Sequence, residues 1–225
     1  MNPNAIIHHL IHGNEQQPVI VIDNFFDDPA TWIDVASSRE FAPLGPYYPG
    51  IRSQLYQNEV SQCIEKLPPL LETAFGHGQY APAESCYSLV TTPPSALLPI
   101  QRLPHFDTFS SDRIAVLIYL NGRSDSGTAF YRQSETGYES VDEARYPSFA
   151  ANLEQSVQQY GMPPPAYIGG NTPIYEQIAR YDGISNRAII YRGNTLHCAE
   201  IPEDLQLTSD PATGRLTINI FLEAC

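Results

Sequence analysis

The sequence predicts a mainly β fold (α+β) built as one domain, residues 1–225. Twenty prolines and 14 glycines favour frequent turns. Fourteen tyrosines against a single tryptophan favour pleated strands over a helical bundle. A single β barrel of this length encloses a substantial core, and 42% hydrophobic with 16% charged residues is typical of a globular protein.

Residues 1–84 are expected to supply a strand and helices that support the main β region. Residues 18–26 form a continuous apolar run, which predicts a strand ending in a turn. The polar residues 1–17 before it are expected to be loosely held. A metal clamp is the less favoured alternative for the histidines of this segment, which are His8, His9 and His12.

Two helices are expected in the same region. Asp28 and Pro29 suit the N-cap and the first turn of a helix over about 29–38. A second helix is expected over about 58–75, with a break at Pro68, because an interior proline removes a hydrogen bond of the helix. The Pro- and Tyr-rich segment 42–57 between them is expected to be a loop. It either packs against the core or covers a substrate site as a lid.

Residues 85–225 are expected to form the β core, with an insertion at 133–172. Hydrophobicity within the insertion predicts an amphipathic helix over about 147–160. Strands are predicted around this insertion where apolar or alternating runs end in turn residues. The predicted strands are 86–91, 98–103, a continuation through 105–107, 113–122, 126–132, 175–181, 187–191, 195–199 and 215–222.

A His-x-Asp pair, His105 and Asp107, carries the strongest chemical signal. Two residues that are two apart on a strand project to the same face. Two such ligands and one further histidine make a 2-His-1-carboxylate triad, which holds Fe(II) and leaves three coordination positions open. His197 is the other histidine within the β-rich half and is the natural third ligand. The alternative for His197 is an ordinary core or surface histidine.

The final strand begins with Arg215-x-Thr217, which places both side chains on one face. A guanidinium binds a carboxylate through two charge-assisted hydrogen bonds. Beside an iron site, Arg215 is the expected anchor for the distal carboxylate of 2-oxoglutarate, and Thr217 could add a hydroxyl donor. Considered alone, Arg215 could also be a surface charge at the end of a strand.

Over about residues 85–223 the chain resembles the Fe(II)/2-oxoglutarate-dependent oxygenases, in particular their prolyl-hydroxylase-like branch. Residues 18–29 also resemble the first strand and helix of that branch. The whole chain further resembles a bacterial family of about this length that is uncharacterised. The matching motifs are His105-Phe-Asp107, Arg113 through Tyr119-Leu-Asn121, Ser126-Gly127-Thr-Ala-Phe, Asn186-Arg-Ala-Ile-Ile-Tyr-Arg, Leu-His197 and Gly214-Arg215-Leu-Thr.

The resemblance implies a double-stranded β-helix (jelly-roll) barrel with supporting helices. It implies Fe(II) bound by His105, Asp107 and His197. It also implies that the Tyr119 hydroxyl contacts the 2-oxoglutarate carboxylate and that Arg215 is the basic residue of the final strand. An aspartate as the second ligand favours hydroxylation over halogenation, because halogenating relatives leave that position open for halide.

The expected function is therefore that of a dioxygenase, which consumes 2-oxoglutarate and O2 and releases succinate and CO2. Its substrate is expected to be a small molecule or a protein side chain that is hydroxylated at a C–H bond. The alternative is a non-catalytic or 2-oxoglutarate-independent jelly roll that binds a metal or another ligand. Binding of both metal and 2-oxoglutarate would distinguish the two.

Net charge, the lengths of apolar stretches and the cysteine pattern limit the possible partners and location. The formal net charge is −13 and Lys66 is the single lysine, which argues against nucleic acid as a partner. No apolar stretch reaches the roughly 20 residues of a membrane span. A signal-peptide pattern is absent and the four cysteines are scattered, so a cytoplasmic protein is expected. The sequence does not indicate the oligomeric state.

Overall fold

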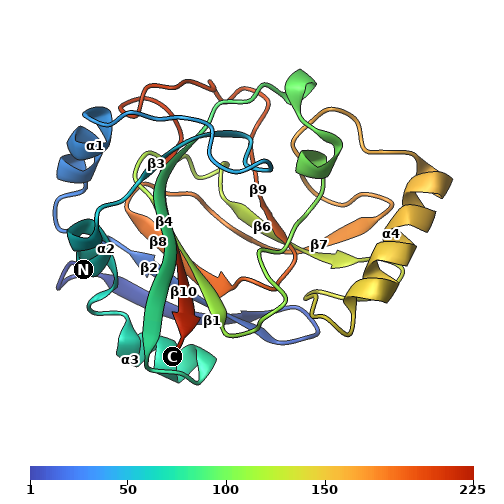
Figure 1. Cartoon of the computed structure of the whole chain (residues 1–225), viewed down its shortest axis with the longest axis horizontal. Helices are drawn as coiled ribbons and strands as arrows, with labels where there is room; N and C mark the ends of the chain where they lie inside the picture. The colour runs from blue at the N-terminus through green and yellow to red at the C-terminus, as the bar shows by residue number, and fades with distance from the viewer.

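Two antiparallel sheets and four helices form the protein in a computed structural model that describes residues 1–225 (Figure 1). The large sheet has the spatial order β1 (Ile6–His12), β2 (Gln17–Asp23), β8 (Arg187–Arg192), β5 (Arg113–Tyr119), β10 (Leu216–Ala224), β4 (Tyr80–Val90) and β3 (Gly50–Gln54). The small sheet has the order β7 (Tyr175–Tyr181), β6 (Thr128–Gln133) and β9 (His197–Ala199). The prediction of a mainly β fold is confirmed.

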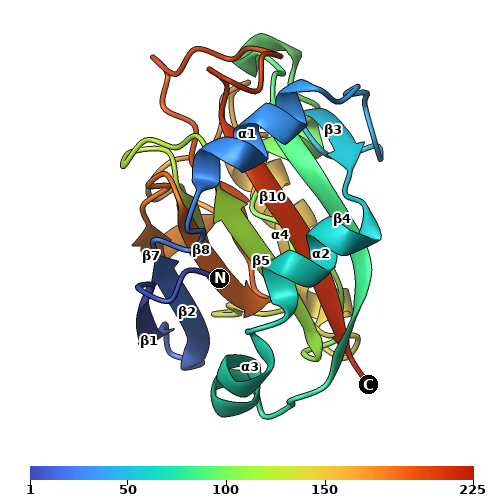
Figure 2. The same cartoon turned by 90° about the vertical axis from the view of Figure 1, so that its left-hand side faces the viewer.

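The helices lie on both sides of the sheets. Figures 1 and 2 show three of them on one face of the large sheet and the fourth beyond the small sheet. The three are α1 (Pro29–Ser37), α2 (Gln57–Ile64) and α3 (Pro68–Phe75), and the fourth is α4 (Tyr146–Tyr160). The order of layers is therefore helices, large sheet, small sheet and α4.

Strand β5 shows why the large sheet is covered on both faces. Its alternate residues Ile114, Val116 and Ile118 belong to the core beneath α1–α3. The residues between them, Ala115, Leu117 and Tyr119, belong to a second core that also contains Phe130 of the small sheet. Successive side chains of a strand point to opposite faces, so a run that is apolar throughout needs cover on both.

The helix predictions are confirmed with small shifts in their bounds. The Asp28 carboxylate accepts a hydrogen bond from the Ala30 N–H at 3.1 Å and caps α1. The helix expected over 58–75 is two helices, and the second begins at Pro68, where proline suits the first turn. The helix expected within 133–172 is α4, which packs with the outer face of the small sheet.

Several sequence predictions of local structure are wrong. Residues 1–17 are not loosely held as a whole, because β1 pairs with β2 along its full length. The segment expected as a strand at 98–103 contains a 3₁₀ helix, η2 (Pro99–Arg102), which begins at a proline. The segment 105–107 is not a strand: it makes a single antiparallel bridge, between His105 and His197.

None of the helices has the length and apolar character needed to cross a membrane.

Asn186 fixes the turn that leads into β8. It has a positive φ of 62°, and its side chain accepts a hydrogen bond from the Phe26 N–H at 2.8 Å and donates one to the Phe26 carbonyl at 2.9 Å. These two bonds hold the turn to the residues that follow β2. Asparagine is among the few residues other than glycine that adopt this backbone conformation readily.

The Asn186→Ala variant is expected to lower the free energy of unfolding by about 2–3 kcal/mol, because two hydrogen bonds are lost and alanine is strained at a positive φ. Asn186→Gly should lose less, since glycine tolerates this φ. Urea unfolding measures both. Asn58→Ala, on the exposed face of α2, is the matched control. Equal stability of Asn186→Ala and wild type would contradict the role of this turn.

Candidate metal centre and active-site cavity

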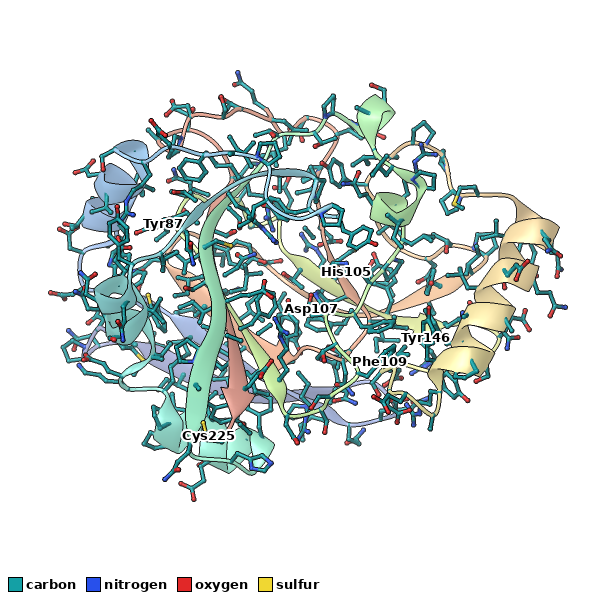
Figure 3. All side chains as sticks on the ribbon, viewed as in Figure 1. Tyr87, His105, Asp107, Phe109, Tyr146 and Cys225 are labelled. Carbon is teal, nitrogen blue, oxygen red and sulfur yellow. The ribbon has the colours of Figure 1, made fainter.

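His105, Asp107 and His197 come together at one point between the two sheets. One ligand atom of each lies within 4.8 Å of the others. The Asp107 carboxylate lies between the imidazoles, with Oδ1 3.8 Å from His105 Nε2 and Oδ2 3.6 Å from His197 Nε2. Figure 3 shows His105 and Asp107 side by side near the middle of the molecule.

Main-chain hydrogen bonds position the three residues, which come from distant parts of the sequence. His105 and His197 exchange two N–H···O bonds, of 2.9 and 2.8 Å. The Asp107 N–H donates to the Gly193 carbonyl at 2.7 Å. The backbone at 105–107 is therefore tied to β9 and to the turn before it. The three side chains meet although 105–107 belongs to no regular strand.

His197 is oriented and held neutral by its surroundings. Its Nδ1 donates to the Thr195 carbonyl at 2.9 Å, because a carbonyl can only accept. Nε2 then carries the free lone pair, the arrangement found in metal-binding histidines. Burial lowers the pKa of His197 to about 4, so the imidazole is neutral at pH 7. The Tyr191 ring packs against it with centroids 4.8 Å apart.

Asp107 carries a buried oxygen without a partner. No donor reaches its Oδ2, which is shielded from solvent. Burial raises the pKa of Asp107, and the neighbouring His105, Arg113 and Arg52 oppose this increase. A buried carboxylate oxygen without a hydrogen bond is costly unless a cation satisfies it. Two imidazole nitrogens and one carboxylate oxygen form a donor set that suits Fe(II).

The three residues open onto a large cavity. It has a volume of about 920 Å3 and is lined by both sheets, by α4 and by the segments around Tyr48 and Leu103. Over half of the lining residues, 23 of 40, are hydrophobic. The His105 side chain is 52% exposed within it. Burial in the surrounding walls and the neighbouring His197 lower the pKa of His105 to about 4, so this imidazole is also neutral at pH 7.

Arg215 and Thr217 line the same cavity. Arg215 is 6% exposed. Its Nε donates to the Ser126 hydroxyl at 2.9 Å, and its Nη2 donates to the Gly127 carbonyl at 3.1 Å. The Thr217 hydroxyl donates to the Asn219 side chain at 2.9 Å. The guanidinium is thus fixed by neutral groups, and no carboxylate of the chain neutralises it.

Tyr119 lies behind the cavity wall. It is fully buried and does not belong to the lining residues. Its hydroxyl shares a 2.6 Å hydrogen bond with the Thr128 hydroxyl, and the Arg215 guanidinium lies 5.2 Å from the centre of its ring. In this structure Tyr119 contacts the residues that line the cavity. Thr128 is one of these lining residues. Sequence reasoning missed it, although it belongs to the Ser126-Gly127-Thr128 motif.

Arg52 is a second residue that sequence reasoning missed. It belongs to the segment 42–57, which was expected to be a loop, but part of this segment is strand β3. β3 pairs with β4 at the edge of the large sheet and directs Arg52 into the cavity. Nothing in the Pro- and Tyr-rich sequence indicates a strand, because its pairing is with residues far along the chain.

The model of a family of unknown function, DUF6445, matches residues 3–222. The chain belongs to this family. No curated protein sequence matches this member of DUF6445.

Solved structures show which fold this DUF6445 chain has. SnoK, a non-heme alpha-ketoglutarate dependent carbocyclase of nogalamycin biosynthesis, superposes with a TM-score of 0.53 at 11% identity, over 93% of this chain and 81% of SnoK. SnoN, an epimerase of the same biosynthesis, superposes with a TM-score of 0.51 at 12% identity, over 93% of this chain and 80% of SnoN. Iron-bound HygX from Streptomyces hygroscopicus superposes with a TM-score of 0.51 at 9% identity, over 93% of this chain and 83% of HygX. At these identities the likeness establishes the fold alone.

We expect the protein to bind a single Mn(II) ion, used as an air-stable substitute for Fe(II). His197→Ala should weaken this binding by more than about 100-fold, because even the loss of a residue that only hydrogen-bonds to a metal ligand costs about 10–100-fold. Electron paramagnetic resonance of free Mn(II) measures the affinity. His77→Ala is the matched control, since His77 lies 3.6 Å from Asp112 as an isolated His–Asp pair outside the cavity. Equal losses in the two variants would contradict the site.

Proposed function

We propose that this protein is an Fe(II)- and 2-oxoglutarate-dependent oxygenase with a double-stranded β-helix (jelly-roll) core. We place it near the prolyl-hydroxylase-like branch on the motifs quoted above. One observation carries the proposal: a 2-His-1-carboxylate cluster and an arginine without a carboxylate partner face the same cavity. The shared fold with non-heme 2-oxoglutarate-dependent enzymes supports it.

His105, Asp107 and His197 would hold the metal. Bound Fe(II) would supply the activation of O2 that no amino-acid side chain can provide. The hydrogen bond from His197 to the Thr195 carbonyl fixes the ring so that Nε2 faces the metal position. Three protein ligands would leave coordination positions of the metal open for other molecules. The role of these residues is to bind and orient, and none of them acts as a general acid or base.

Arg215 would bind the distal carboxylate of 2-oxoglutarate. Ser126 and Gly127 occupy Nε and Nη2 and hold the guanidinium plane still, while Nη1 makes no hydrogen bond within the protein. A fixed, desolvated guanidinium binds a carboxylate strongly, because little conformational entropy is lost. Thr217 would add a hydroxyl at the same wall. Tyr119, which lies behind the cavity wall, would orient Thr128 through a hydrogen bond and Arg215 through contact with its ring.

The remaining cavity would hold the substrate. A volume of about 920 Å3 accommodates the cosubstrate together with a small molecule or a protein side chain. Its mostly apolar lining excludes water around the metal, which protects reactive species from side reactions. We propose hydroxylation of a C–H bond as the reaction, with release of succinate and CO2, and a cytoplasmic location.

Purified protein supplied with Fe(II), ascorbate and 2-oxoglutarate in air is expected to release succinate even without a substrate. His105→Ala should reduce this release to the rate of the metal-free protein, because one of three ligands is lost. His77→Ala should keep the wild-type rate. Succinate can be quantified by chromatography. If wild type binds the metal but neither binds 2-oxoglutarate nor forms succinate, the protein is a metal-binding jelly roll without this activity.

Arg215→Gln is expected to raise the KM for 2-oxoglutarate about 10–100-fold, since a charge-assisted pair is lost. Glutamine keeps a polar side chain that can donate hydrogen bonds, but it is shorter and carries no charge. Arg123→Gln, an exposed arginine paired with Asp125 and Asp204, removes the same charge elsewhere and should leave the KM unchanged. An unchanged KM in Arg215→Gln with intact Mn(II) binding would contradict the assignment of Arg215 and leave the metal site standing.

A further inference from the structure

Arg52 differs from every other arginine of this protein. Of the eleven arginines, seven form ion pairs with carboxylates, namely Arg39, Arg113, Arg123, Arg132, Arg145, Arg180 and Arg187. Three others donate to neutral oxygens, and these are Arg102, Arg192 and Arg215. The Arg52 guanidinium makes neither kind of contact, and its buried Nε has no hydrogen-bond partner.

The position of Arg52 is set by strand register. Arg52 of β3 pairs with Ser88 of β4, which pairs with Thr217 of β10. Residues directly opposite each other on neighbouring strands point to the same face. Arg52, Ser88 and Thr217 therefore form one row on the face of the large sheet that borders the cavity, and Arg52 and Thr217 are among its lining residues.

Arg52 is held in place without being neutralised. The Tyr48 ring stacks on its guanidinium, with Cζ 3.9 Å from the ring centre. Such a contact orients the group and leaves its N–H donors free.

A half-buried guanidinium without a partner is costly, and this chain has acidic residues in excess. It contains 25 aspartates and glutamates against 12 lysines and arginines. Even so, no carboxylate is placed beside Arg52. Unsatisfied buried donors are rare in folded proteins and call for an explanation. An anionic group of a ligand satisfies the Arg52 donors and removes this cost.

The residues at the mouth of the cavity indicate the chemical character of the rest of such a ligand. Large apolar side chains that line the cavity are also exposed to solvent there. They come from the 42–49 segment, η2, the start of α4 and the residues after α4, and they are Leu44, Tyr47, Ile100, Tyr146 and Met162. Phe106, which lies between His105 and Asp107 in the sequence, also lines the cavity, and its ring centroid is 6.3 Å from that of Tyr146 at the start of α4. An apolar surface thus extends from the mouth toward the metal ligands.

We propose that Arg52 binds the carboxylate of the primary substrate, and that this substrate is an organic acid with an apolar body. Arg215 would bind the carboxylate of 2-oxoglutarate, so the cavity has two separate anion positions. Only the description of the acid as the oxidised substrate rests on the proposed oxygenase function. The binding site itself is independent of catalysis.

The test compares acids with their neutral counterparts. Octanoate and 4-phenylbutyrate are titrated calorimetrically into the protein, each beside its primary amide. Wild type is expected to bind each acid at least about tenfold more tightly than its amide, because only the acid pairs with a guanidinium. Arg52→Gln should lose this preference and Arg52→Lys should keep part of it. Arg123→Gln, the charge-matched surface control, should keep all of it.

A second titration separates the two anion positions. With Mn(II) and saturating 2-oxoglutarate present, the acids are expected to bind as before. Displacement of the acids by 2-oxoglutarate, together with weaker 2-oxoglutarate binding by Arg52→Gln, would make Arg52 a cosubstrate contact and overturn the proposal. It would also be overturned if wild type bound acid and amide equally, or bound both acids more weakly than about 10 mM.

The outcomes distinguish this proposal from the oxygenase function. Arg52-dependent binding of the acids in a protein that forms no succinate would remove the oxygenase function and leave the acid site. Succinate formation by a wild-type protein that shows no preference for acids would support the oxygenase function and overturn the acid site at Arg52.

Discussion

The antiparallel bridge between His105 and His197 is the contact on which the candidate site depends. Two main-chain hydrogen bonds join an irregular segment to the short strand β9. The bond from the Asp107 N–H to Gly193 extends this attachment by two residues. Side-chain positions follow from these backbone bonds, so the three ligand atoms are already gathered by the fold. A preformed cluster of this kind reduces the entropy that metal binding has to overcome.

The bridge also explains why the site lies between the sheets. The large sheet is covered by α1–α3 on one face, and its other face meets the small sheet around Phe130, Thr128 and the end of β7 at Tyr181. Beyond this contact the sheets enclose the cavity, and β9 carries His197 along its wall. The inner face of the large sheet can therefore carry polar residues in register that line the cavity, such as Arg52 and Thr217. In a packed core these groups would be costly, whereas a ligand or water in the cavity can satisfy them.

Charge is distributed so that the cavity differs from the rest of the molecule. The net charge is −13, and most arginines are paired with carboxylates. Arg52 and Arg215 lack such partners and both border the cavity. Two of the four arginines without a carboxylate partner are thus placed where anions would bind, in surroundings that are less screened than the surface. The same pattern supports a 2-oxoglutarate position at Arg215 and a second acid at Arg52.

The sequence by itself determined the features that depend on local pattern. Apolar runs and turn residues located most strands, and aspartate and proline located the start of α1 at Pro29 and the break before α3 at Pro68. Residue type and order identified His105, Asp107 and His197 as a possible ligand set. Arg215 and Thr217 followed from their spacing on one strand. These inferences can be drawn from sequence because side-chain periodicity and ligand chemistry are properties of short segments.

Tertiary structure decided whatever depends on pairing between distant residues. β1 and β3 are strands because β2 and β4 offer them hydrogen bonds, although their sequences resemble loops. The same pairing turned Arg52 toward the cavity, and the packing of Tyr119 against Thr128 and Arg215 put it behind the wall. Local sequence does not specify which face of a sheet will border a cavity. That choice is made by long-range register, since a shift of one residue reverses the direction of every side chain in a strand.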